Sequence, residues 1–144
     1  MMIRTVLITA TIAIGITGVV AQTDVITQRK ELMKKNSQQT KAVSAMVKGE
    51  APFDAKAATT AFTVWSETAA QLPKLFPDNS KTGGETRALP KIWTDRKGFD
   101  AEIAAFAKAS SARPTDVESL KKAFTAVSKA CGDCHEGYRA AAKK

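Results

Sequence analysis

The chain has 144 residues, with 22 Lys and Arg against 14 Asp and Glu, and its net charge at pH 7 is +8. Positive charge attracts nucleic acids as well as acidic proteins. The basic residues are scattered among acidic ones and accompany no nucleic-acid-binding motif, so nucleic acid is excluded as the predicted partner. The sequence also has no nucleophile paired with a base and no second cluster of titratable residues, so it does not predict an enzyme.

The first 21 residues have the pattern of a secretory signal peptide. Arg4 precedes an uncharged apolar run over residues 6–20, and small residues stand before a predicted cut after Ala21. This run of about 15 residues is shorter than the roughly 20 that a membrane-spanning helix needs, and no later segment is apolar enough to span. We therefore expect cleavage of residues 1–21, export to the periplasm, and no membrane span in the mature chain.

The mature chain, residues 22–144, is predicted to be one domain. Its 123 residues fall in the size range of a single hydrophobic core. Only Arg4 among the charged residues is lost on cleavage, so the net charge of the mature chain is +7. This charge favours partner proteins with acidic docking surfaces.

The first predicted helix runs from Asp24, a good N-cap, to Lys48, where Gly49 is a stop signal. The polar segment Asn36–Thr40 interrupts its apolar stripe, whose members recur at helical spacing: Val25, Leu32, Met33, Val43, Met46 and Val47. We therefore expect a long helix with one irregular stretch on its buried face.

The second predicted helix is capped by Asp54 and ends at Leu72, because Pro73 follows. A loop over residues 73–89 comes next, rich in Pro, Gly, Asn and Thr. It is long for a connection between bundle helices, and loops of this length are often functional or variable.

The third predicted helix begins at Pro90 and ends at Ser110 and Ser111. The fourth opens with a capping-box pattern over residues 115–118 and continues to about residue 143. No strand pattern is present. The sequence therefore predicts an all-α fold, an antiparallel up-down-up-down four-helix bundle.

The segment Cys131-Gly132-Asp133-Cys134-His135 carries the predicted chemistry. A C-x-x-C-H motif on a helix places two thiols one turn apart for thioether bonds to the porphyrin, and sets an imidazole beside the second one for the iron. The sequence therefore predicts one covalent haem c, near the C-terminal end of the last helix.

Three other interpretations of the two cysteines are weaker. A structural zinc site needs about four protein ligands, and the chain has no Cys or His beyond Cys131, Cys134 and His135. A thioredoxin-like redox pair belongs to a βαβ unit, which the sequence does not predict. A disulfide next to an incidental histidine stays open as an alternative.

Since His135 is the only histidine, a second axial histidine from the same chain is excluded. The mature methionines are Met33 and Met46. Counted from the predicted helix ends, Met33 lies at nearly the level of His135, whereas Met46 is roughly 20 Å further along the helix. We predict Met33 as the second axial ligand, with core packing as its alternative, and Met46 as a core residue. A thioether opposite His suits single-electron transfer, and an open position favours gas binding.

With these features the sequence resembles the class II c-type cytochromes, the cytochrome c-prime family, in which the haem motif lies at the C-terminal end of a four-helix bundle. The resemblance covers residues 22–144 and includes the haem motif with Tyr138 and Arg139 after it, Arg29 with Met33, residues 48–54, and residues 90–93. It implies an apolar side chain over the distal face of the iron, usually with five-coordinate iron that binds nitric oxide or carbon monoxide. Because Met33 occupies that position, the chain looks like the methionine-ligated, low-spin branch, cytochrome c-556.

The resemblance also implies that Arg29, and less directly Arg87, approach a haem propionate, while Arg139 lies near the proximal face or in solvent. The polar segment Asn36–Thr40 departs from the apolar dimer face usual in the family, so both a monomer and a homodimer stay open. The leading hypothesis is a periplasmic single-electron carrier for redox partners with acidic surfaces. The alternative is a five-coordinate protein that binds nitric oxide or carbon monoxide.

Overall fold

The computed structural model describes residues 17–142 of the chain. Its four long helices are α1 (Thr17–Lys48), α2 (Ala55–Gln71), α4 (Arg96–Ser110) and α5 (Val117–Tyr138). The connection between α2 and α4 holds two short 3-10 turns, Leu72–Lys74 and Asp78–Ser80, and the one-turn helix α3 (Lys91–Thr94). Most of the predicted signal peptide, residues 1–16, lies outside the described residues.

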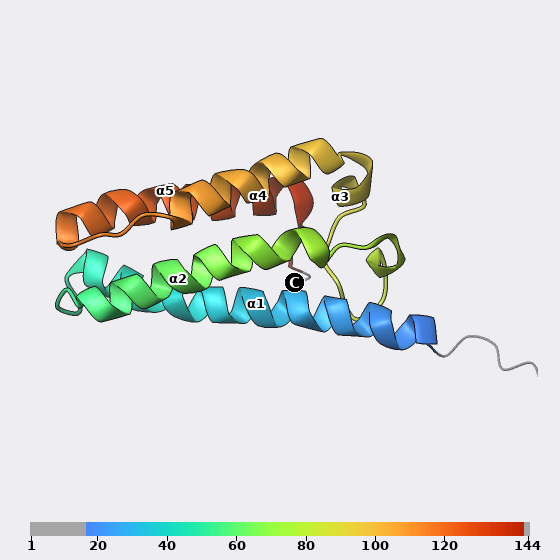
Figure 1. Cartoon of the computed structure of the whole chain (residues 1–144), viewed down its shortest axis with the longest axis horizontal. Helices are drawn as coiled ribbons and strands as arrows, with labels where there is room; N and C mark the ends of the chain where they lie inside the picture. The colour runs from blue at the N-terminus through green and yellow to red at the C-terminus, as the bar shows by residue number, and fades with distance from the viewer. Residues whose placement is uncertain (1–16, 143–144) are drawn as a thin grey trace, which may run out of the picture.

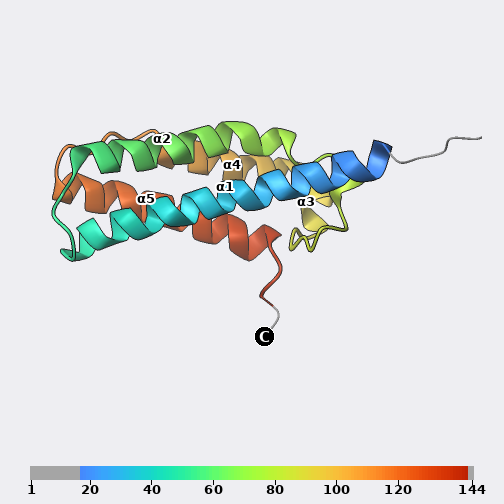
Figure 2. The same ribbon diagram turned by 90° about the horizontal axis from the view of Figure 1, so that it is seen from below.

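The long helices form an antiparallel bundle, which confirms the predicted fold class (Figures 1 and 2). α1 packs against α2, α2 against α4 and α4 against α5, and α5 closes the ring by contacting α1. Successive helices alternate in direction, so the C-terminal end of α5 lies beside α1. Between Thr17 and Ala142, no helix has the length and hydropathy required to cross a membrane.

Acidic caps begin two of the helices. The Asp54 carboxylate accepts hydrogen bonds from two backbone amides at the start of α2, as the sequence predicts. At the start of α5 the capping box consists of Asp116 and Ser119, each side chain accepting from the other residue's backbone N–H. The sequence-based pattern was therefore displaced by one residue, because Asp116 rather than Thr115 is the N-cap.

Two predicted helix ends were wrong. Asp24 lies inside α1 rather than at its start, because the helix already includes residues 17–23. Its carboxylate accepts a hydrogen bond from the Gln28 side chain at 2.8 Å instead of capping the helix. α5 ends at Tyr138 rather than near residue 143. It stops because Arg139 is extended (φ −127°, ψ 129°) and pairs with Ala88 in an isolated antiparallel bridge.

The predicted third helix is in fact two helices, α3 and α4, separated by Asp95. The backbone of Asp95 leaves helical geometry (φ −125°, ψ 57°), and its carboxylate caps α4 by accepting from the Gly98 amide at 3.1 Å. Trp93 anchors α3, because its indole N–H donates to the carbonyl oxygens of Phe76 and Pro77. The break in the helix turns α3 away from the axis of α4.

The core runs along the bundle axis and includes Met46, which is 4 % exposed. The prediction of Met46 as a core residue is therefore confirmed. The irregular polar segment of α1 also has a structural explanation. Asn36 is buried, and its side-chain oxygen accepts a hydrogen bond from the Thr68 hydroxyl of α2 at 2.9 Å.

Candidate haem site

A cavity of about 330 Å³ lies where the N-terminal half of α1, the connection before α3 and the last turns of α5 meet. Five of the predicted site residues line it: Arg29, Met33, Arg87, Cys134 and His135. The sixth, Cys131, is half-buried and packs against the hydrophobic core. The fold thus gathers residues from both ends of the chain around one space.

Cys131 and Cys134 are not joined by a disulfide. Burial raises the pKa of Cys131, and burial together with the charges of Glu102 and Cys131 raises the pKa of Cys134 to about 11. Before a haem is attached, both side chains are therefore neutral thiols at neutral pH. They lie one helical turn apart on α5, as the thioether chemistry of a C-x-x-C-H motif requires.

His135 lies in the last turn of α5 and is half-buried. Burial lowers its pKa, and the positive charges of Arg139 and Arg87 lower it further. The imidazole is therefore neutral at pH 7, which leaves a ring nitrogen with a lone pair that can bind a metal.

Met33 is half-buried and lines the same cavity from α1. The predicted position of Met33 along the bundle was counted from the start of the first helix and the end of the last one. In the structure, both of these helix ends differ from the predicted ones. Met33 and His135 nevertheless line the same cavity. The packing of α1 against α5, rather than the position of the helix ends, determines which helical turns are neighbours.

Arg29 is only 6 % exposed, so it is a buried charge rather than one on the solvent-facing side of α1. Its Nη2 donates to the Ser80 carbonyl oxygen at 3.1 Å, and its guanidinium lies 4.5 Å from the centroid of the Phe76 ring. Its Nη1 is buried and has no hydrogen-bond partner within the described part of the chain, and burial lowers its pKa. An unpaired buried guanidinium donor beside a cavity fits an anionic group of a ligand.

Arg87 and Arg139 are exposed at the edge of the cavity. The Arg87 carbonyl oxygen accepts from the Ala140 amide at 2.8 Å, which ties the long connection to the chain after α5. Arg139 lines the cavity as well and is exposed to solvent. Three arginines therefore surround a space that also holds the imidazole.

Ile26 and Tyr138 also belong to the site, although neither was predicted from the sequence as a site residue. Both are buried and line the cavity, Ile26 being 1 % exposed. A helical pattern could have indicated Ile26, because it precedes Arg29 by three residues and Met33 by seven. Tyr138 similarly follows His135 by three residues on α5.

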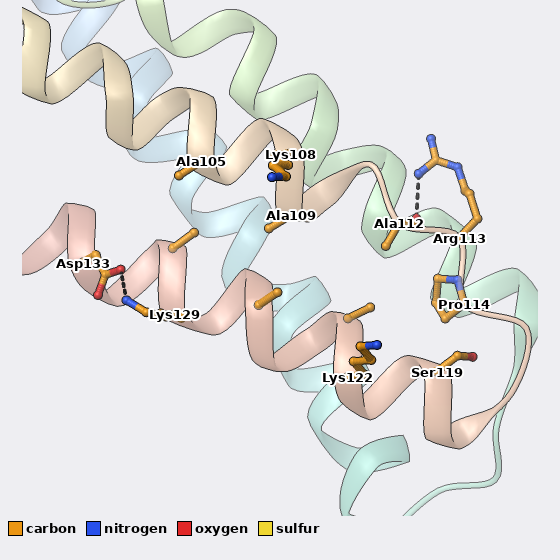
Figure 3. Close-up of a pocket in the computed structure, with 13 residues that line it drawn as sticks. Ala105, Lys108, Ala109, Ala112, Arg113, Pro114, Ser119, Lys122, Lys129 and Asp133 are labelled. Carbon is orange, nitrogen blue, oxygen red and sulfur yellow. Dashed lines mark hydrogen bonds and ion pairs between the residues drawn. The ribbon is translucent and has the colours of Figure 1, made fainter.

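A second, larger space is a groove of about 710 Å³ between α4 and α5 (Figure 3). Its floor consists of alanines from both helices, and Lys108 and Lys122 lie along it. At one end the Lys129 ammonium contacts the Asp133 carboxylate. None of the six predicted site residues lines this groove.

A helical bundle with a C-x-x-C-H motif in its last helix and a cavity beside the motif defines a c-type cytochrome. Residues 24–139 match the family model described as cytochrome c', and the chain belongs to this family. Its cofactor is haem c, and proteins of this kind carry electrons.

Curated relatives agree with this assignment. The chain is 40% identical to cytochrome c-556 of Rhodopseudomonas palustris, over 96% of this chain and 97% of the relative. It is 42% identical to cytochrome c' of the same organism, over 97% of this chain and 98% of the relative. A solved structure of cytochrome c' from Rhodopseudomonas palustris superposes with a TM-score of 0.79 at 41% identity, covering 83% of this chain and 98% of that one.

Proposed function

We propose that the chain is a single-electron carrier of the periplasm whose iron has two axial ligands, His135 and Met33. The observation that carries this proposal is that Met33 and His135 line one cavity together with Cys134. In the proposal, Cys131 and Cys134 hold the haem through thioether bonds.

Haem c supplies an iron centre that accepts and releases one electron. His135 contributes a neutral imidazole, and Met33 contributes a neutral thioether. A thioether opposite an imidazole raises the reduction potential relative to two imidazoles, and two protein ligands leave no position for a gas. Half-burial of both side chains also limits the access of water to the metal.

Arg29 is the proposed partner of a haem propionate. Its unpaired Nη1 supports this role, because a buried guanidinium donor gains most from a carboxylate. Arg87 is the second proposed propionate partner. Its exposed position makes it the weaker one, because water competes for an exposed guanidinium.

The proposed location is the periplasm, reached after removal of residues 1–21, with residues 22–144 as the working domain. Redox partners with acidic surfaces are supported by three exposed cations at the edge of the cavity, Lys30, Arg87 and Arg139. Among the described residues that line the cavity, the one exposed acid is Glu85, whose carboxylate is 3.9 Å from the Lys30 ammonium. Such encounters are typically weak and transient.

The visible spectrum of the purified, haem-loaded protein tests the proposal. We expect a low-spin spectrum that does not change when carbon monoxide is added to the reduced protein. A high-spin spectrum that shifts with carbon monoxide would show instead a five-coordinate protein that binds small gases. A mature protein whose mass lacks a tetrapyrrole adduct, after expression with a haem-attachment system, would remove both interpretations.

A further inference from the structure

The Tyr138 hydroxyl donates a hydrogen bond to Asp95 Oδ2 at 2.8 Å. The other oxygen of the same carboxylate accepts from the Gly98 amide and so caps α4. One carboxylate therefore joins the first turn of α4 to the last residue of α5, although Asp95 and Tyr138 are far apart in the sequence.

The surroundings of this hydrogen bond are tightly fitted. Tyr138 is 7 % exposed, and Phe99 packs edge-on against its ring at 5.3 Å between centroids. The Lys91 ammonium lies 5.0 Å from the centroid of the same ring. A side chain at Gly98 would collide with the Tyr138 oxygen and the Asp95 carboxylate, so glycine is required there for the two groups to meet.

Both groups have the ionisation state that this hydrogen bond needs at neutral pH. The Tyr138 hydroxyl lowers the pKa of Asp95, and burial with the Asp95 carboxylate raises the pKa of Tyr138 to about 12. The donor is therefore a neutral phenol and the acceptor an ionised carboxylate, a combination that gives a stronger hydrogen bond than two neutral groups do.

Tyr138 is also close to the proposed iron ligand. It follows His135 by three residues, so the two side chains lie on one face of α5, and both line the cavity. The helix ends at Tyr138, and Arg139 after it is extended. The last turn of α5 has therefore no further helical turn to hold it, and the Asp95 contact fixes it from the side.

We infer that Asp95 and Tyr138 are positioning residues for His135: the carboxylate fixes the phenol, and the phenol fixes the turn of α5 from which the imidazole reaches the iron. This inference rests on the proposed role of His135 as an axial ligand. Removal of a group that orients a metal ligand without touching the metal typically lowers metal affinity or activity by roughly 10- to 100-fold.

The test compares three variants of the haem-loaded protein with the wild type. Tyr138→Phe removes only the hydroxyl and leaves the charge unchanged. Asp95→Ser keeps a side chain that can cap α4 but is too short to reach the phenol. Asp54→Ser is the matched control, because it makes the same replacement at the N-cap of α2, whose carboxylate bonds only to the start of its own helix among the described residues.

Two measurements report on the imidazole rather than on stability: the reduction potential and the proton NMR shifts of the haem methyl groups, which follow the orientation of the axial imidazole ring. We expect Tyr138→Phe and Asp95→Ser to move both, with the equilibrium constant for reduction changing on the order of tenfold. Asp54→Ser leaves both at the wild-type values.

Wild-type potential and methyl shifts in Tyr138→Phe, with or without a lower melting temperature, would overturn the inference and leave the proposed function intact. Equal shifts in all three variants would overturn it too, because they would reflect general loosening of the bundle. If the wild-type protein itself shows no histidine bound to iron, the proposed function fails first and this inference fails with it.

Discussion

Met33 in α1 and His135 in α5 line one cavity, and both side chains are neutral and half-buried. In the proposed function, two neutral ligands leave the charge on the iron uncompensated by the ligands themselves. The nearby guanidinium of Arg29 adds a buried positive charge. The propionate proposed as its partner offsets that charge, so the raised reduction potential expected here comes from the thioether opposite the imidazole.

The Met33→Leu variant tests the second ligand. We expect the low-spin spectrum to be replaced by a high-spin one, and the reduced protein to bind carbon monoxide, because leucine fills the space of methionine but has no sulfur for the iron. The exchange of Met for Leu usually costs less than about 1.5 kcal/mol in stability, so the variant is expected to fold.

Met46→Leu is the matched control for this experiment. Met46 is the same residue type in the same helix, but it lies in the core and its sulfur accepts a hydrogen bond from the Asp54 amide at 3.3 Å. The Met46→Leu variant should therefore retain the low-spin spectrum. If Met33→Leu also retains it, Met33 is a packing residue and the iron ligand is another group.

Replacement of Arg29 tests the predicted contact with a propionate. In the haem-loaded protein, Arg29→Met removes a charged donor from the Ser80 carbonyl and from the proposed carboxylate. We expect the free energy of unfolding, measured with guanidinium chloride, to fall by about 2 kcal/mol, since hydrogen bonds of charged groups contribute roughly 1.5–3 kcal/mol.

Arg96→Met serves as the control, because Arg96 also bonds to a carbonyl and a carboxylate, those of Pro73 and Asp100, but its side chain is 38% exposed. An exposed pair of this kind contributes less than about 1 kcal/mol. Equal losses in the two variants would argue against a buried anionic partner for Arg29.

Local sequence signals predicted much of the fold. The cap at Asp54 and the stripes at helical spacing depend on residues within a few positions of each other, and the structure confirms them. The break at Asp95 was missed because the carboxylate is fixed by Tyr138, which lies far along the chain. The end of α5 was missed for the same reason, since Arg139 pairs with Ala88 of the long connection.

The site shows the same division between local and distant information. The haem motif and the place of Met33 in the cavity could be predicted, because the motif is local and the mature chain has only two methionines. The burial of Arg29 could not, because it depends on Phe76 and Ser80 in an irregular segment whose path no periodicity indicates. Helical spacing places a residue on a face of a helix, but tertiary contacts decide what covers that face.

The hydrogen bond between Asn36 and Thr68 predicts a non-additive pair of substitutions. Thr68→Val removes the hydroxyl and leaves the buried Asn36 side-chain oxygen without this donor. The free energy of unfolding should therefore fall by about 1–3 kcal/mol. The double variant Asn36→Leu/Thr68→Val should recover part of this loss, because both polar groups are then gone.

A double-mutant cycle from denaturant unfolding measures the coupling of these two residues. Thr125→Val is the control, since its hydroxyl bonds only to the Lys121 carbonyl within α5 in the described structure and it is exposed. Thr125→Val should change the free energy of unfolding by no more than about 0.5 kcal/mol. Strict additivity at Asn36 and Thr68 would show that the contact does not contribute to stability.

The charges at the edge of the cavity predict the salt dependence of electron transfer. The exposed residues Lys30, Arg87 and Arg139 should attract an anionic oxidant, so the oxidation of the reduced protein by hexacyanoferrate(III), followed by stopped-flow absorbance, should slow as salt is added. A cationic cobalt(III) oxidant should show the opposite trend.

Lys30→Glu and Lys122→Glu separate local charge from net charge, because each changes the net charge by the same amount. Lys122 lies in α5 about 20 Å along the helix from His135, at the usual rise of 1.5 Å per residue. That distance is about twice the Debye length of about 10 Å at 0.1 M salt. At this ionic strength, Lys30→Glu should slow the reaction with hexacyanoferrate(III) more than Lys122→Glu does. Equal effects would mean that the net charge, rather than the cations beside the cavity, governs the encounter.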